Sequence, residues 1–268
     1  MQWRKGPFRP RETRARRLTM WLLAATVLVV GVLTGLTGVG GILVIPVLQT
    51  ASGLSVQAAM ATALCSFFFV GAVAVWLQQR RQAIDWAPAL PLAASAAVAS
   101  PLGAVANAHA PVVLLQLVLS LLIVFAGSSA LFPPKAGALL RFEPASRRHR
   151  AIMVGIGAVV GFFSGLTGAG GPVLSIPIMV ALGFPPLLSI AAGQVLQVAV
   201  AASGTLGNLF YGVVDFPVVA WITAVQLLGL VFGIRLSPLV SPQRLRRLVA
   251  SLCLLVGAYG CIRALVAS

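Results

Sequence analysis

The stretch Gly31-Val-Leu-Thr-Gly-Leu-Thr-Gly-Val-Gly-Gly41 occurs twice in this chain, the second time as Gly161-Phe-Phe-Ser-Gly-Leu-Thr-Gly-Ala-Gly-Gly171. The copies lie 130 residues apart, and seven of their eleven positions are identical. The offset recurs downstream, where one isolated acid, Asp85, matches another, Asp215. Because a chance match between isolated acids is rare in a chain so poor in them, we interpret the pattern as an internal duplication.

The composition excludes a water-soluble protein. Of the 268 residues, 59% are hydrophobic and only 9% are charged, whereas about a quarter of a soluble domain is charged. The apolar residues form segments of roughly 20 residues, the length of a membrane-spanning helix. We therefore expect an all-α polytopic membrane protein. It should have about eight transmembrane segments, as two homologous four-segment halves, each with a first helix broken by glycine.

Basic residues divide the chain into four parts. Residues 1–18 form a basic tail, 19–134 the first transmembrane repeat, 135–150 a basic linker, and 151–268 the second repeat. The positive-inside rule predicts a cytoplasmic tail and linker. The net charge of +15 then reflects orientation and contact with anionic headgroups, not nucleic-acid binding.

Two features of the topology stay open. If all eight segments are single spans, the cluster Arg244–Arg247 lies outside, opposite the cytoplasmic Arg80–Arg81 loop, which the positive-inside rule disfavours. If the broken segments are hairpins, the number of crossings changes. The halves are then either parallel or inverted, and inversion requires an odd number of crossings per half.

The glycine clusters Gly38–Gly41 and Gly168–Gly171 predict two helix breaks, because each glycine in a helix interior costs about 1 kcal/mol relative to alanine. Unwound backbone inside a membrane is tolerated only where it is buried in protein or lines a cavity. A half-helix that restarts after the break, from Ile42 or Pro172, presents free N–H groups and a positive dipole end, which favour an anion. The outer Gly-x-x-x-Gly pairs, Gly31/Gly35 and Gly161/Gly165, favour close helix packing instead.

Polar side chains near the breaks and in the second segments extend this candidate site. Hydroxyl groups flank each break, and Thr62 and Ser66 share one helix face. Gln194 and Gln197 either line a path or form interhelical hydrogen bonds. The predicted substrate-binding residues are Thr34, Thr37, Gly38, Gly40, Gly41, Ser164, Thr167, Gly168, Gly170, Gly171, Thr62, Ser66, Gln194 and Gln197.

The four acids, Glu12, Asp85, Glu143 and Asp215, all lie away from the middle of a predicted span. Asp85 and Asp215 each precede a third segment, where a helix N-cap is expected and proton coupling is the alternative. No set of His, Cys or acidic residues suggests hydrolysis or metal binding. We expect no enzyme, no cofactor and no metal. A site of backbone dipoles, hydroxyls and amides suits a small anion.

The doubled Gly-x-x-[Ser/Thr]-Gly-Leu-Thr-Gly-x-Gly-Gly motif, each copy followed by proline, resembles the sulfite exporter TauE/SafE family of membrane transporters. The pairs Ile84-Asp85 and Val214-Asp215 are similar too. The resemblance covers about residues 19–266 and implies a bacterial-type inner-membrane protein whose substrate region lies at the breaks. The Gly-Thr-Ser-like stretch common in that family reads here as Ala61-Thr62-Ala63 and Ala192-Gly193-Gln194, which leaves the substrate open.

Taken with this resemblance, the sequence predicts a multi-pass transporter of the inner (plasma) membrane with a cytoplasmic N-terminus. It should move a small anion, such as sulfite, an organosulfonate or a related sulfur oxyanion, by alternating access. The alternatives are a small carboxylate carrier on the same fold, or a non-transport membrane assembly factor whose glycines serve only packing. The sequence leaves the coupling ion, the direction and the oligomeric state open.

Overall fold

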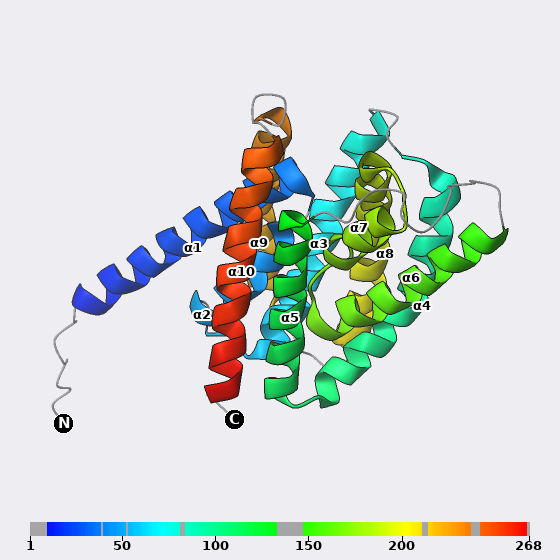
Figure 1. Cartoon of the computed structure of the whole chain (residues 1–268). Coiled ribbons are helices and arrows are strands. Elements are labelled where there is room, and N and C mark those ends of the chain that lie inside the picture. The colour runs from blue at the N-terminus through cyan, green and yellow to red at the C-terminus, as the bar shows by residue number, and fades with distance from the viewer. Residues whose placement is uncertain are drawn as a thin grey trace, which may run out of the picture.

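The computed structural model describes residues 10–38, 40–51, 53–80, 84–132, 147–210, 214–236 and 242–266. Residues 1–9 of the predicted tail and most of the predicted linker lie outside these ranges. The described chain is helical and contains no strand (Figure 1). Its elements are α1 (Pro10–Thr37), η1 (Gly40–Leu43), α2 (Val44–Ala51), α3 (Val56–Arg80), α4 (Trp86–His109), α5 (Val112–Leu131), α6 (Arg147–Thr167), α7 (Pro172–Ala181), α8 (Pro186–Leu209), α9 (Phe216–Leu236) and α10 (Pro242–Val266).

Seven of the described helices are long and apolar enough to cross a membrane, namely α3, α4, α5, α6, α8, α9 and α10. The apolar part of α1, Leu23–Thr37, and helix α7 are shorter. The expectation of about eight segments therefore corresponds to seven helices of spanning length together with shorter apolar helices. The helical membrane class is confirmed.

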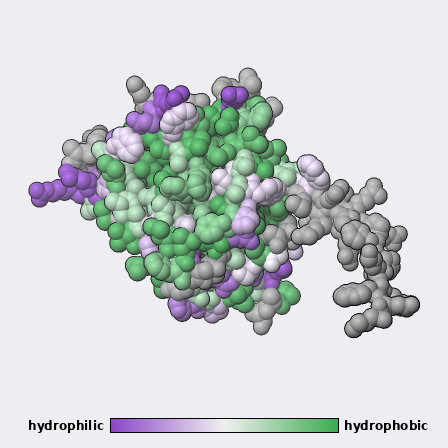
Figure 2. Space-filling view, turned by 180° about the vertical axis from the view of Figure 1, so that it is seen from behind, coloured by the Kyte–Doolittle hydropathy of each residue, from purple (hydrophilic) through white to green (hydrophobic). Residues whose placement is uncertain are grey.

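The outer surface is apolar in the way that a lipid-facing surface is. Large hydrophobic side chains point outward, including Val98 at 74% exposure and Leu255 at 69%. Hydrophobic residues cover most of the face shown in Figure 2, and hydrophilic residues lie mainly toward its edges. A soluble protein rarely exposes so extended an apolar surface, so lipid is the solvent that fits it.

The outer glycines bring helices into backbone contact. A Cβ atom on Gly161 of α6 would lie 2.6 Å from the Cα atom of Ala96 of α4. One on Gly31 of α1 would lie 3.1 Å from the Cα atom of Gly229 of α9. Such close approach is the use that membrane helices make of small residues. The packing role predicted for these glycines is confirmed.

Positions that the offset of 130 relates occupy corresponding places in the bundle. Helix α4 packs on α6, and its counterpart α9 packs on α1. The counterparts α3 and α8 cross in opposite directions: Thr62, near the start of α3, accepts a hydrogen bond from the backbone of Asp215, beyond the end of α8 (3.2 Å). Duplication would produce this correspondence, with the two copies inverted, and it remains a prediction from the sequence.

The ends of the helices bring two of the basic clusters to the same side of the bundle. The end of α3 and the start of α10 lie at the same upper end of the bundle in Figure 1. The arrangement with eight single spans would have separated them. The reason is that α6 and α7 form a hairpin, since the His149 ring in the first turn of α6 lies 6.2 Å from the Phe184 ring just after α7.

Candidate functional site

Both glycine clusters interrupt their helices as predicted. Helix α1 ends at Thr37, and Gly38 follows with a φ of 77°. Helix α6 ends at Thr167, and Gly168 and Gly170 have φ values of 67° and 74°. This left-handed region is unfavourable for residues with a Cβ atom, so glycine is what allows the chain to leave the helix.

The second break is also held tightly by its neighbours. A Cβ atom on Gly168 would overlap the backbone carbonyl of Met60 on α3. Asn107 on α4 donates a hydrogen bond to the carbonyl oxygen of Leu166 in the last turn of α6 (2.6 Å). An orphan carbonyl at a helix end is thereby satisfied. Asn107 is 2% exposed, and its amide fixes where α6 stops.

The two breaks meet around one small cavity of ≈ 10 Å³. The ring of Phe67 on α3 lies between them, because a Cβ atom on Gly41 would lie 3.2 Å from it and one on Gly170 would lie 3.3 Å from it. Residues more than 120 positions apart thus share one wall. The lining consists of Thr34, Gly38, Gly41, Ile42, Phe67, Ala169, Gly170, Pro172, Val173 and Gln197.

The polarity of this cavity comes from helix ends and amides. Helix α7 begins at Pro172 without a side-chain cap, so the N–H groups of its first turn lack intrahelical acceptors and carry the positive end of the dipole. The Gln197 amide Nε2 donates to the carbonyl oxygen of Phe67 (3.3 Å). The Gln194 Nε2 donates to that of Gly38 (3.3 Å). Both glutamines therefore form interhelical bonds, and Gln197 also lines the cavity.

The threonine hydroxyls beside the breaks already have acceptors. Thr34, Thr37 and Thr167 donate to the carbonyl oxygens four residues earlier, at 2.8, 2.8 and 2.7 Å. Such back-bonding is common for threonine within helices. These hydroxyls would have to rotate to donate to an anion. The Ser164 hydroxyl is buried and has no hydrogen-bond partner in the described part of the chain.

Not every predicted site residue lies at the cavity. Thr62 and Ser66 face α9, where Ser66 donates to Gln226 Oε1 and accepts from Thr223, both at 2.9 Å. This buried polar cluster is a separate group. The structure brings five predicted residues into the lining, Thr34, Gly38, Gly41, Gly170 and Gln197. It leaves outside that lining Thr37, Gly40, Ser164, Thr167, Gly168, Gly171, Thr62, Ser66 and Gln194.

Sequence reasoning missed Phe67, which forms the centre of the cavity wall. The offset of 130 could have indicated it, since Phe67 corresponds to Gln197, and the two meet in space. It also missed Asn107, Thr223 and Gln226, whose partners are distant in sequence. No local sequence pattern identifies such residues.

Asp85 and Asp215 cap helices. The Asp85 Oδ1 accepts from the Ala87 N–H (3.0 Å), and the Asp215 Oδ1 accepts from the Val218 N–H (3.1 Å). Each side chain thus satisfies a donor in the first turn of a third segment, α4 or α9. The N-cap interpretation is confirmed, and proton coupling at these acids stays untested.

Replacing Asp215 with asparagine should leave both folding and transport close to normal, because an asparagine oxygen caps a helix as well as aspartate does. Alanine should lower the free energy of unfolding by about 1 kcal/mol. Thermal unfolding in detergent measures the cap, and the pH dependence of anion flux measures coupling. If both variants fold and both lose the pH dependence of flux, a purely structural role of Asp215 is contradicted, because neither asparagine nor alanine can carry a proton at this position.

That comparison is sharpened by Asp85→Asn, which makes the same chemical change at the corresponding cap of α4. Normal flux and a normal unfolding temperature in both asparagine variants would support capping at both sites. A loss of flux in one of them, with unchanged unfolding temperature, would assign that acid a role in coupling.

These features define a class of protein. The described helices are apolar outside, seven of them have spanning length, and two broken helices enclose a cavity without any cluster of three metal-ligating residues in the ranges that the structure covers. Such an arrangement is that of a multi-pass membrane protein with a central site.

The chain belongs to the sulfite exporter TauE/SafE family, whose model matches residues 1–79 and 23–260. It is therefore a membrane transporter and not an enzyme. No curated protein and no solved structure matches the chain significantly.

Proposed function

We propose that this protein moves sulfite, an organosulfonate or a related sulfur oxyanion across the plasma membrane, with export as the direction, around the cavity between the two breaks. The family supports the substrate class. The main support for this site is that residues of both breaks and the uncapped start of α7 line the same cavity. Helix N-termini bind oxyanions through free N–H groups and the helix dipole.

The chemistry of the lining favours an anion over a cation. It offers backbone N–H groups, the Gln197 amide and one threonine, and no carboxylate lies among the lining residues. A buried cation without a counter-charge is strongly disfavoured. A sulfur oxyanion presents several acceptor oxygens, which suit the N–H groups at the start of α7 and the second N–H group of the Gln197 amide.

The size of the cavity indicates a closed conformation. Its ≈ 10 Å³ is about the space that one water molecule requires. Sulfite, with a sulfur and three oxygens, needs several times more. The Phe67 ring and the two breaks would have to separate to admit it. In the proposed alternating access, the glycines at positive φ are the hinge points at which α1 and α6 change direction.

The corresponding packing of the two halves supports the rest of the proposal. In the second half, the hairpin of α6 and α7 is followed by α8, α9 and α10, which gives three crossings. An odd number of crossings per half is the condition for inverted halves. We place the predicted basic linker, 135–150, in the cytoplasm on the positive-inside rule. The two halves then exchange roles as the site opens to one side and the other.

Changing Gln197 to leucine tests this site. Leucine keeps most of the side-chain volume and removes the amide donor. Since a hydrogen bond to a charged group contributes about 1.5–3 kcal/mol, the rate of sulfite efflux from proteoliposomes should fall at least about tenfold. Efflux is measured with sulfite, thiosulfate, methanesulfonate and acetate in parallel.

The matched control is Gln79→Leu, the same change at an exposed position in the last turn of α3. Its efflux should equal that of the unmodified protein. Unchanged efflux in a folded Gln197→Leu variant would refute the site. Acetate moving faster than every sulfur anion would favour a carboxylate carrier, and no flux for any anion would refute the transport proposal.

A further inference from the structure

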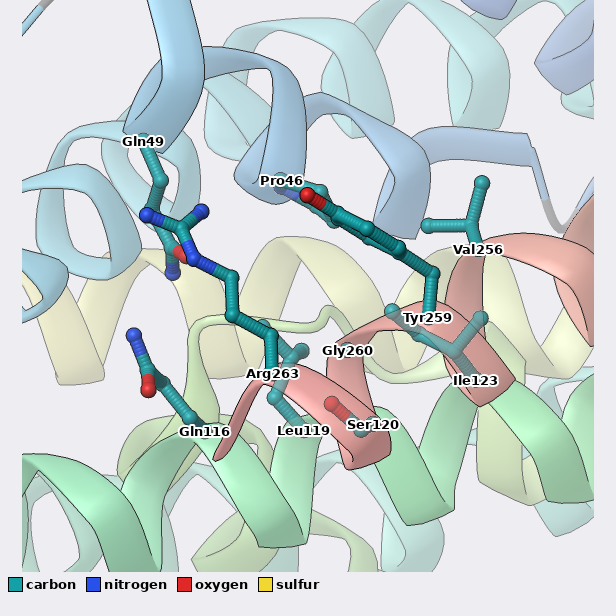
Figure 3. A pocket seen from close by; sticks show the side chains of 10 residues that line it. All are labelled: Pro46, Gln49, Gln116, Leu119, Ser120, Ile123, Val256, Tyr259, Gly260 and Arg263. Carbon is teal, nitrogen blue, oxygen red and sulfur yellow. The ribbon is translucent and has the colours of Figure 1, made fainter. Parts of the chain in front are cut away.

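A second cavity, of ≈ 60 Å³, lies between α2, α5 and α10 (Figure 3). It could hold several water molecules or a small oxyanion. None of the proposed substrate residues lines it. The lining consists of Pro46, Gln49, Gln116, Leu119, Ser120, Ile123, Val256, Tyr259, Gly260 and Arg263.

The polar groups of this second cavity converge. The guanidinium of Arg263 and the amides of Gln49 and Gln116 extend from three different helices toward the same space (Figure 3). No carboxylate is among the lining residues. The Nε2 atom of Gln49 is buried and has no hydrogen-bond partner in the part of the chain that the structure describes. A buried donor left unpaired is costly, so this amide points to a missing acceptor.

We propose that this second cavity is an anion-binding vestibule in which Arg263, Gln49 and Gln116 hold an oxyanion. A guanidinium binds sulfonate or carboxylate oxygens through two parallel N–H groups. Each glutamine amide adds a donor from another direction. The inference rests on the proposed function for the identity of the anion, which is the transported sulfur oxyanion.

The place of the vestibule in the fold links it to the central cavity. Gly41 and Ile42 border the central cavity, whereas Pro46 and Gln49 border the vestibule. The two sites therefore share η1 and α2, and roughly 12 Å of helix separates Gly41 from Gln49. Movement of this short segment would affect both sites at once.

The packing of α2 does not require a polar residue at position 49. After the one-residue insertion in the second copy, Gln49 corresponds to Val180 of α7, an apolar residue. The vestibule is thus specific to one end of the bundle. Arg263 is exposed, so it places a cation at the outer side of this cavity.

A lipid phosphate has the same oxyanion chemistry, and arginines near helix ends often extend to headgroups. The vestibule favours a small soluble anion because Gln49 Nε2 is buried, beyond easy reach of a headgroup. The two sources are separated by measuring binding in phosphate-free detergent, with and without added phosphatidylglycerol.

The test is titration of the purified full chain with methanesulfonate at constant ionic strength, followed by calorimetry. Arg263→Gln should weaken binding by at least about tenfold, because it removes the charge from a charged hydrogen bond. Gln49→Leu should weaken it by a smaller factor. The matched control, Arg235→Gln, changes an exposed arginine at the end of α9 and should bind as the unmodified protein does.

Proteoliposome efflux then separates this inference from the proposed function. Arg263→Gln should raise the KM for the anion and leave the maximal rate near normal, whereas Gln197→Leu should lower the maximal rate. Binding that depends on Arg263 in a protein without any flux would support the vestibule and refute transport. Unchanged binding in Arg263→Gln, or binding abolished by phosphatidylglycerol, would overturn the vestibule.

Discussion

Replacing Gly165 with leucine should prevent this protein from folding. A Cβ atom at this position of α6 would overlap the backbone carbonyl of Ser100 and would lie 3.1 Å from the backbone nitrogen of Ala104. Both groups belong to α4, and backbone atoms cannot rotate away as a side chain can. Overpacking that a side chain cannot relieve should exceed about 4 kcal/mol, which is exceptional for one substitution.

The measurement is the yield of monodisperse protein in detergent, together with its unfolding temperature. Gly155→Leu is the matched control, because it places the same residue in the same helix at an exposed position with no neighbouring atom within 4 Å. This control should fold normally. A Gly165→Leu protein of normal yield and stability would show that α4 and α6 are not held by this contact.

Replacing Gly41 with leucine should stop transport and leave folding largely intact. The position is not at positive φ, and the nearest neighbour of a Cβ atom is the Phe67 ring, at 3.2 Å. A ring on a side chain can move, so the protein can accommodate the change. The leucine would nevertheless fill a cavity of ≈ 10 Å³ and would keep Phe67 from its closed position.

An overpacking cost of about 1–3 kcal/mol in the closed conformation corresponds to a fall in anion flux of about tenfold or more. Efflux from proteoliposomes and the unfolding temperature are measured on the same preparation. Gly155→Leu is again the matched control, because a Cβ atom at that exposed position has no neighbouring atom within 4 Å, and this variant should transport anions normally. If Gly41→Leu transports normally, the central cavity is not on the path. If it fails to fold, the glycines at this break serve packing.

The sequence predicted the two helix breaks more reliably than it predicted which side chains line the candidate cavity between them. The clusters at Gly38 and Gly168 predicted the breaks because glycine weakens a helix wherever it stands. By contrast, Thr62 and Ser66 share a helix face as predicted, but that face meets Thr223 and Gln226 of α9. Helical periodicity fixes which residues lie together on one helix and says nothing of which neighbour that face meets.

The sequence by itself determined the membrane class, the helical segments, the two breaks and the family resemblance, since hydropathy and glycine content act locally along the chain. Only the tertiary structure decided that the two breaks enclose one cavity around Phe67, that α6 and α7 return to the same end, and that Arg263 meets Gln49 and Gln116. These contacts join residues far apart in sequence. Their physical cause is the packing of whole helices. A Gly-x-x-x-Gly pattern predicts that a helix packs closely, but it does not say which helix it meets.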